Sequence, residues 1–270
     1  MDTWLPEWWW FAYLVLGLVV GFFAGMLGIG GGVIIVPLLA FLFTAQHFPE
    51  ERVLHLVLGT SLTSIVFTNL SSVYAHHLRA AVRWDIVRAA APGIIVGTLL
   101  GALCAERLSS RYLAIIFTGF VCYASVQMLL DRRPQPSRQL PGKVGMSVAG
   151  LSVGALSSLV GVGGGIITIP LMIMCNVPMI NCIGTSAAIG LPISVAGAIG
   201  YVVTGLDKSH LPPLSLGYVY IPALAGLVLG SIVTVPFGAR VAHGMPVALL
   251  KRIFAVVLII LAAKMLYSLA

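Results

Sequence analysis

Two stretches of this sequence decide its fold: Gly17-Leu-Val-Val-Gly-Phe-Phe-Ala-Gly-Met-Leu-Gly-Ile-Gly-Gly-Gly-Val-Ile-Ile-Val-Pro-Leu38 and Gly150-Leu-Ser-Val-Gly-Ala-Leu-Ser-Ser-Leu-Val-Gly-Val-Gly-Gly-Gly-Ile-Ile-Thr-Ile-Pro-Leu171. Eleven of their 22 aligned positions are identical, where about two or three would match by chance. A Gly-Thr-Ser segment then follows in each half, beginning at Gly59 and at Gly184. The chain is therefore predicted to contain two copies of one unit, residues 8–130 and 144–270, joined by a Pro-rich, basic linker at 131–143.

The composition of both units is that of a membrane protein. Hydrophobic residues make up 59% of the 270 positions, and only 9% are charged, whereas soluble domains carry about 25% charged residues. Long runs lack any charged side chain, and a helical span needs about 20 apolar residues. The runs do not alternate between polar and apolar residues as barrel strands do. The sequence therefore predicts an all-α integral membrane protein, and membrane topology explains the net charge of +7 better than nucleic-acid binding does.

The first uncharged run, residues 8–44, is too long for one span and is interrupted by glycines at positions 28 and 30–32. We expect a hairpin of two short helices that meet at membrane depth, followed by full spans at 54–75, 89–105 and 112–130. Each unit would then contain a broken-helix hairpin plus three transmembrane helices. Two full crossings in place of each hairpin would give ten helices in all, and the sequence leaves that alternative open.

The charge distribution predicts how the units are oriented. An odd number of crossings per unit inverts the second unit relative to the first, and it divides the basic residues ten against five between the two membrane faces. Counting the broken run as one crossing makes the units parallel and weakens the bias to nine against six. Since basic residues gather on the cytoplasmic side, we expect inverted repeats, a cytoplasmic linker at 131–143 and both termini outside.

The glycines lie where the second arm of each hairpin would begin. The first N–H groups of a helix lack acceptors within it, the helix dipole is positive there, and glycine allows a ligand to approach the backbone closely. Two such sites would converge near the midplane, as in transporters with discontinuous helices. The alternative is that the glycines are helix-packing contacts. The predicted anion-binding residues of these segments are Gly30, Gly31, Gly32, Gly163, Gly164 and Gly165.

Hydroxyl groups of the repeated Gly-Thr-Ser segment complete the expected site. Hydroxyls can donate to an oxyanion without adding a fixed charge, although they can also bond back to their own helix. The residues are Thr60, Ser61, Thr185 and Ser186. Asn69 and a few other amides are expected to flank the site or cap helices. A role in gating or proton handling is possible for His76 and His77, at the cytoplasmic end of a predicted span.

No residue pattern in the sequence indicates an enzyme. The acidic residues fall at the ends of predicted spans or in loops, so no buried carboxylate is expected in the membrane interior. No catalytic triad, zinc-binding motif or phosphate-binding loop is present, and we expect no catalytic residues, no metal and no cofactor. Two alternatives to a transporter stay open: a passive anion channel, and a sulfur-relay protein that would use Cys175 and Cys182.

Taken together, the duplicated Gly-x-Gly-Gly-Gly segments, each followed by a proline at Pro37 or Pro170, resemble the sulfite exporter TauE/SafE family. The resemblance covers residues 11–267. It implies a bacterial inner-membrane transporter, an exporter of small sulfur-containing anions such as sulfite or organosulfonates. The expected partners are that anion and the lipid bilayer, without nucleic acid, and the oligomeric state stays open. Alternating access around the glycine site is the mechanism that the paired half-helices suggest.

Overall fold

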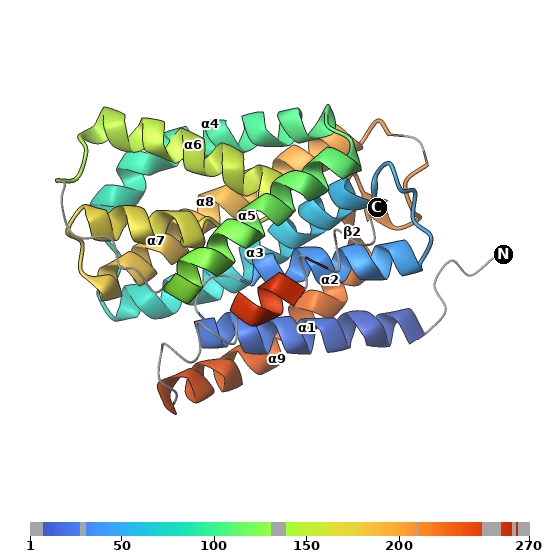
Figure 1. Ribbon diagram of the computed structural model, residues 1–270, viewed down its shortest axis with the longest axis horizontal. Helices are drawn as coiled ribbons and strands as arrows, with labels where there is room; N and C mark the ends of the chain where they lie inside the picture. Colours follow the sequence, from blue (N-terminus) through green and yellow to red (C-terminus); the bar gives the residue numbers. More distant parts are fainter. Residues whose placement is uncertain are drawn as a thin grey trace.

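The computed structural model describes residues 8–27, 31–130, 139–208, 210–244, 255–260 and 263. In this part of the chain, helices run roughly along the long axis of the molecule (Figure 1). They are α1 (Trp8–Leu27), α2 (Gly32–Ala45), α3 (Val53–Leu78), α4 (Trp84–Glu106), α5 (Ser110–Leu130), α6 (Lys143–Val160), α7 (Gly165–Met174), α8 (Met179–Gly205) and α9 (Ile221–Gly244). Two short antiparallel strands, β1 (Ser215–Leu216) and β2 (Val219–Tyr220), precede α9.

The helices confirm an all-α integral membrane protein. Five described helices, α3, α4, α5, α6 and α8, are long and apolar enough to cross a membrane. Large apolar side chains such as Leu70, Tyr112 and Ile232 are about 60% exposed, as lipid-facing residues would be. The spans expected at 54–75, 89–105 and 112–130 coincide with α3, α4 and α5.

Both glycine segments interrupt helices, but the arms of each hairpin are unequal. The first arms, α1 and α6, have 20 and 18 residues, whereas the second arms, α2 and α7, have 14 and 10. At 1.5 Å per residue, only the first arms approach the about 30 Å of a bilayer core. The expectation of two short helices is therefore wrong for α6, which is long enough to cross a membrane, whereas Trp8–Ala24 of α1 is among the shorter apolar helices. Figure 1 shows α2 returning toward the end at which α1 began.

The most extensive helix packing joins one half of the chain to the other. Helix α1 packs along α9, and α4 packs along α6. A Cβ atom added to Gly17 would lie 2.6 Å from the Gly226 carbonyl oxygen, and one added to its counterpart Gly150 would lie 2.5 Å from that of Ala90. Glycines at these positions therefore allow the backbones of α1 and α9, and of α4 and α6, to approach closely.

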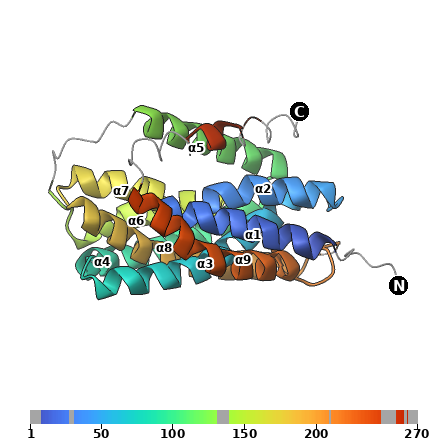
Figure 2. The ribbon, with the colours of Figure 1, turned by 90° about the horizontal axis from the view of Figure 1, so that it is seen from below.

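Corresponding helices of the two halves follow opposite courses in Figure 1, where α1 runs toward the left and α6 toward the right. In Figure 2, α5 lies along one edge of the molecule. The inversion of the halves across a bilayer and the unit boundaries at 130 and 144 stay predictions. Most of the linker, residues 131–138, lies outside the described residues.

Candidate functional site

Each glycine segment turns the chain into the short second arm of its hairpin. Gly31 precedes α2 with φ of 68°, and Gly164 precedes α7 with φ of 78°. Gly161 ends α6 with φ of 69°. These left-handed conformations are readily available only to glycine, so the repeated glycines are what permits both turns. Gly30, a predicted site residue, lies outside the described residues.

The two glycine turns meet in the interior of the molecule. A Cβ atom on Gly32 would lie only 2.7 Å from the Gly161 carbonyl oxygen and 3.1 Å from the Val162 Cα. The Ser61 hydroxyl donates a hydrogen bond of 3.0 Å to the same Gly161 oxygen. Figures 1 and 2 show α2 and α7 lying end to end, each beginning near the middle of the molecule. The structure therefore brings predicted residues of the first half against the second-half turn.

Both short arms begin with free helix amides. The N–H groups of Ile34 and Ile35 donate to the Gly31 carbonyl oxygen, and those of Ile167 and Thr168 donate to that of Gly164. The amides before them, at positions 32, 33, 165 and 166, have no backbone acceptor among the described residues. Together with the positive end of the helix dipole, such amides favour an anion.

The threonine hydroxyls of the Gly-Thr-Ser segments each accept a hydrogen bond from the backbone N–H of the residue that precedes another helix. The Thr60 hydroxyl accepts a hydrogen bond of 3.0 Å from the Tyr220 N–H, just before α9. Thr185 accepts one of 2.9 Å from the Arg83 N–H, just before α4. The two repeated threonines therefore make equivalent hydrogen bonds in the two halves, each to the start of a helix.

Ser186, the last of the predicted hydroxyl residues, shares a hydrogen bond of 2.8 Å with the Thr168 hydroxyl. Thr168 also bonds the Gly164 carbonyl oxygen at 3.1 Å. Both side chains are at most 5% exposed. The bonds of the Gly-Thr-Ser hydroxyls in the described part of the chain thus run to other elements, rather than back to their own helices as the alternative supposed.

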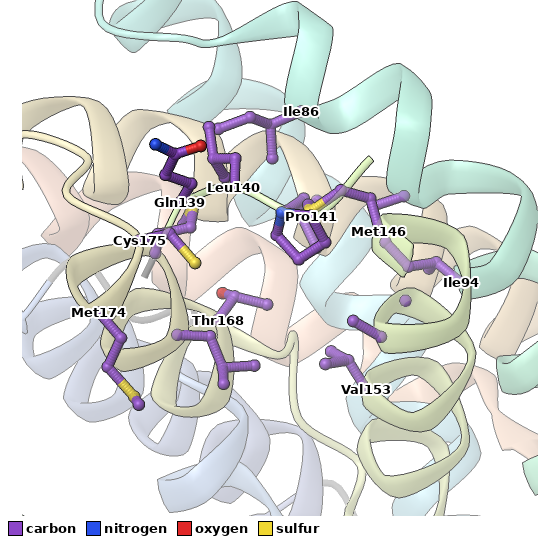
Figure 3. A pocket seen from close by; sticks show the side chains of 16 residues that line it. Ile86, Ile94, Gln139, Leu140, Pro141, Met146, Val153, Thr168, Met174 and Cys175 are labelled. Atoms are coloured by element: carbon purple, nitrogen blue, oxygen red, sulfur yellow. The ribbon is translucent and has the colours of Figure 1, made fainter. Parts of the chain in front are cut away.

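A cavity of about 170 Å³ opens beside the second-half turn, near the N-terminal ends of α4 and α6. Figure 3 shows Thr168 in the middle of its lining, with Cys175 and Met174 on one side and Met146 and Val153 on the other. The other lining residues are mostly apolar: Ile86, Ala90, Ile94, Gln139, Leu140, Pro141, Ala149, Gly150, Leu171, Met172 and Ile189. The duplicated stretch 150–171 contributes Gly150, Val153, Thr168 and Leu171 to this cavity, but it did not predict the cavity, because the other walls come from separate segments.

The two histidines lie in the last turn of α3. The exposed His77 accepts a hydrogen bond of 3.2 Å from the Trp84 indole N–H through Nδ1. His76 is half-buried, and its Nδ1 has no partner among the described residues. A gating or proton-handling role for them stays a prediction. Within the described segments, no three His, Cys, Asp or Glu side chains are grouped to hold a metal ion.

The opposite end of the bundle carries a charged cluster, which we call the far-end cluster: Arg52, Glu106, Lys208 and Tyr218. The Lys208 Nζ lies 2.5 Å and the Arg52 Nη1 3.5 Å from Glu106 Oε1, and Arg52 also donates to the Tyr218 hydroxyl at 2.9 Å. Burial, and then the nearby Glu106, raise the pKa of Tyr218, so its phenol stays protonated.

The Glu106 side chain in this cluster is only 17% exposed. Its Oε2 is buried and has no hydrogen-bond partner in the described part of the chain. The sequence predicted a carboxylate at the end of a span, and Glu106 is the last residue of α4. It did not predict this burial, because the basic partners come from distant segments.

The sequence is similar, over most of its length, to a known protein family and to proteins named as probable membrane transporters. The family described as sulfite exporter TauE/SafE matches residues 13–265. A protein named "Probable membrane transporter protein" from Haemophilus influenzae is 34% identical over 253 residues, which cover 93% of this chain and 96% of that protein. The probable membrane transporter protein YdhB of Bacillus subtilis is 28% identical, with 88% and 90% covered. One from Methanocaldococcus jannaschii is 24% identical, with 84% of each covered. No solved structure matches the chain.

Proposed function

The chain belongs to the sulfite exporter TauE/SafE family and is a multi-pass membrane transporter, and we propose that it exports small sulfur-containing anions such as sulfite or organosulfonates. In this proposal it is a secondary transporter of a bacterial inner membrane. The anion binds where the two glycine turns meet, among the predicted glycines and the hydroxyl residues around them. The sulfur-containing substrate is inferred from the family description, whereas the preference for an anion is inferred from the residues of the two turns.

The observation that carries the proposal is that the N-terminus of α2 lies, away from the surface, against the turn that leads from α6 into α7. Gly32 contacts the Gly161 carbonyl across the halves, and α2 and α7 both start at these turns with unpaired amides among the described residues. Two positive helix ends in an apolar environment favour a negative charge between or beside them. Transporters with broken helices bind their substrates in this way near the bilayer midplane.

The mechanism we propose is alternating access with inverted repeats. The opposite courses of α1 and α6 support the inversion, and the charge bias supports a cytoplasmic linker with both termini outside. In this orientation the cavity beside Thr168 opens toward the cytoplasm, and the far-end cluster closes the outer side. Rocking of one half against the other would open the outer side and close the cavity.

The proposal is tested by measuring anion flux. Purified protein is reconstituted into liposomes loaded with sulfite or with methanesulfonate, and release is followed against protein-free liposomes. We expect saturable release of both anions and no comparable release of K⁺ or glucose. Release no faster than from protein-free liposomes would contradict the proposed cargo.

The sulfur-relay alternative makes a separate prediction about the cysteines. Cys175 lines the cavity, whereas Cys182 is buried and its thiol donates to the Val177 carbonyl oxygen at 3.2 Å. We expect a variant with all four cysteines changed to Ala or Ser to keep wild-type flux, because backbone amides and hydroxyls, not thiols, bind the anion. Loss of flux in a folded cysteine-free protein, restored by Cys175 alone, would favour the relay.

A further inference from the structure

The two glycine turns, nearly identical in sequence, have different surroundings. A Cβ atom on Gly31 would meet only the apolar carbons of Ala24, Val20 and Ile35 among its nearest atoms. Gly32 is pressed against the Gly161 carbonyl and Ile65. The nearby Ser61 hydroxyl already donates to Gly161. The described residues of the first-half turn, Gly31 and Gly32, therefore show packing contacts.

The second-half turn instead faces two polar side chains. The Asn69 Nδ2 lies 3.4 Å from the position of a Cβ atom on Gly163, and the Ser157 Oγ lies 3.3 Å from that of Gly164. Asn69 belongs to α3 of the first half, and Ser157 to α6 of the second. The two halves of the molecule thus each present one polar group to the same turn.

Both polar groups are buried without a partner. Asn69 is 5% and Ser157 1% exposed, and neither Asn69 Nδ2 nor Ser157 Oγ has a hydrogen-bond partner among the described residues. A serine hydroxyl can rotate toward a carbonyl of its own helix, but a buried amide nitrogen with two N–H donors is costly when it is left unsatisfied. Asn69 in particular needs an acceptor, and none of the described residues provides one.

The chemistry of these groups defines the class of ligand that they can bind. Asn69 Nδ2 can only donate, as can the free amides at the start of α7, and a hydroxyl readily does so. The helix end adds positive potential. A ligand that accepts several hydrogen bonds and carries negative charge meets all of these requirements, and a tetrahedral or pyramidal oxyanion presents several oxygen atoms at once.

We propose, on the premise of the transport function above, a narrower site than the one given there: the oxyanion is bound by the second-half turn alone, with Asn69 as its ligand from the first half. Its oxygen atoms accept hydrogen bonds from Asn69 Nδ2, from Ser157 Oγ and from the first amides of α7. The first-half turn supports this site by packing and does not bind the anion. The adjacent cavity, whose lining includes Val153 and Thr168, is the route by which the anion reaches the turn.

The first test removes the Asn69 donor. Binding of sulfite and of methanesulfonate to the purified full chain is measured by calorimetry for Asn69→Leu and Asn69→Asp. Loss of a hydrogen bond to a charged ligand should raise the Kd by about 10- to 100-fold in Asn69→Leu, and the added carboxylate of Asn69→Asp should abolish binding. Thr118→Val is the matched control, because Thr118 is also buried with an unpartnered hydroxyl but lies on α5.

The second test compares the two turns through Gly31→Ala and Gly164→Ala. Both glycines have positive φ, so both variants should lose similar thermal stability. Only Gly164→Ala should weaken anion binding. Equal weakening by Gly31→Ala would overturn the assignment to the second-half turn.

These measurements distinguish a failure of the proposed transport function from a failure of the Asn69 site. If the wild-type protein binds neither anion, the proposed function is wrong and this inference falls with it. If the wild-type protein binds them and both folded Asn69 variants bind with the same Kd, the proposed function stands and the Asn69 assignment is wrong.

Discussion

At the scale of single residues, the predicted hydroxyls mainly hold the fold together. The sequence placed Ser61 and Ser186 near the glycine turns, and the structure brings them there. It could not show that Ser61 is engaged with a carbonyl 100 positions away, because partners of that kind depend on tertiary packing. Asn69 was expected only to flank the site or cap a helix, because the repeat does not duplicate it: the corresponding position in the second half is Ser194.

Removing the Ser61 hydroxyl should weaken the junction between the two turns. Ser61→Ala takes a hydrogen bond from the buried Gly161 carbonyl, and we expect a loss of about 1–3 kcal/mol in unfolding free energy with anion affinity nearly unchanged. Thermal unfolding in detergent, with and without methanesulfonate, measures both effects. Thr63→Ala is the control, because the Thr63 hydroxyl bonds only to Gly59 of its own helix and its loss should cost less. A large fall in affinity in Ser61→Ala would instead make Ser61 a ligand.

At the scale of helices, apolar run lengths and glycine positions were enough to locate the elements. The charge-free runs predicted α3, α4 and α5 to within a few residues, and the glycines predicted the breaks. The unequal arms could not follow from the total length of the run, 8–44, because arm length depends on where the glycines interrupt the run. Glycine packing, the alternative for the motif, occurs along α1 and α6 at Gly17 and Gly150, and also at Gly32 of the motif, which lies against the Gly161 carbonyl.

The close approach of α1 to α9 predicts that Gly17 tolerates no side chain. In Gly17→Ala the added Cβ would lie within 2.9 Å of backbone atoms of Gly226 and Leu227, and backbone cannot move aside as a flexible side chain can. We expect a loss of about 1–3 kcal/mol and a lower Tm. Gly119→Ala on α5 should be neutral or gain up to about 1 kcal/mol, because a Cβ atom there meets nothing within 4 Å. Equal Tm values for the two variants would refute the packing account.

At the scale of the whole molecule, the two ends of the bundle differ. One end holds the cavity beside Thr168, and the other holds the far-end cluster, which ties α3 and α4 of the first half to Lys208 and Tyr218 of the second. The charge count predicted which residues lie at membrane faces. It could not predict that three of them, Arg52, Glu106 and Lys208, gather around Tyr218 in one cluster, since only the packing of α3, α4 and α8 brings them together.

The far-end cluster should act as a closure in the proposed alternating-access cycle. Glu106→Gln removes the charge that Arg52 and Lys208 share, and a loss of about 1 kcal/mol would raise the population open at that end roughly fivefold. The readout is the rate at which a membrane-impermeant maleimide labels Thr60→Cys in a cysteine-free background. Asp85→Asn is the control, because the exposed Arg83–Asp85 pair joins neighbours in sequence rather than the two halves. Unchanged labelling in Glu106→Gln would rule out the closure.

The central claim is that the protein is a transporter that moves sulfur oxyanions by alternating access, and counterflow tests it most directly. Proteoliposomes are loaded with excess unlabelled sulfite and diluted into a trace of radiolabelled sulfite. A transporter exchanges one anion for another across a single site, so we predict that the label accumulates transiently inside above its external concentration. Label that only equilibrates would identify a passive channel, and label that does not enter beyond the level of protein-free liposomes would contradict sulfite transport altogether.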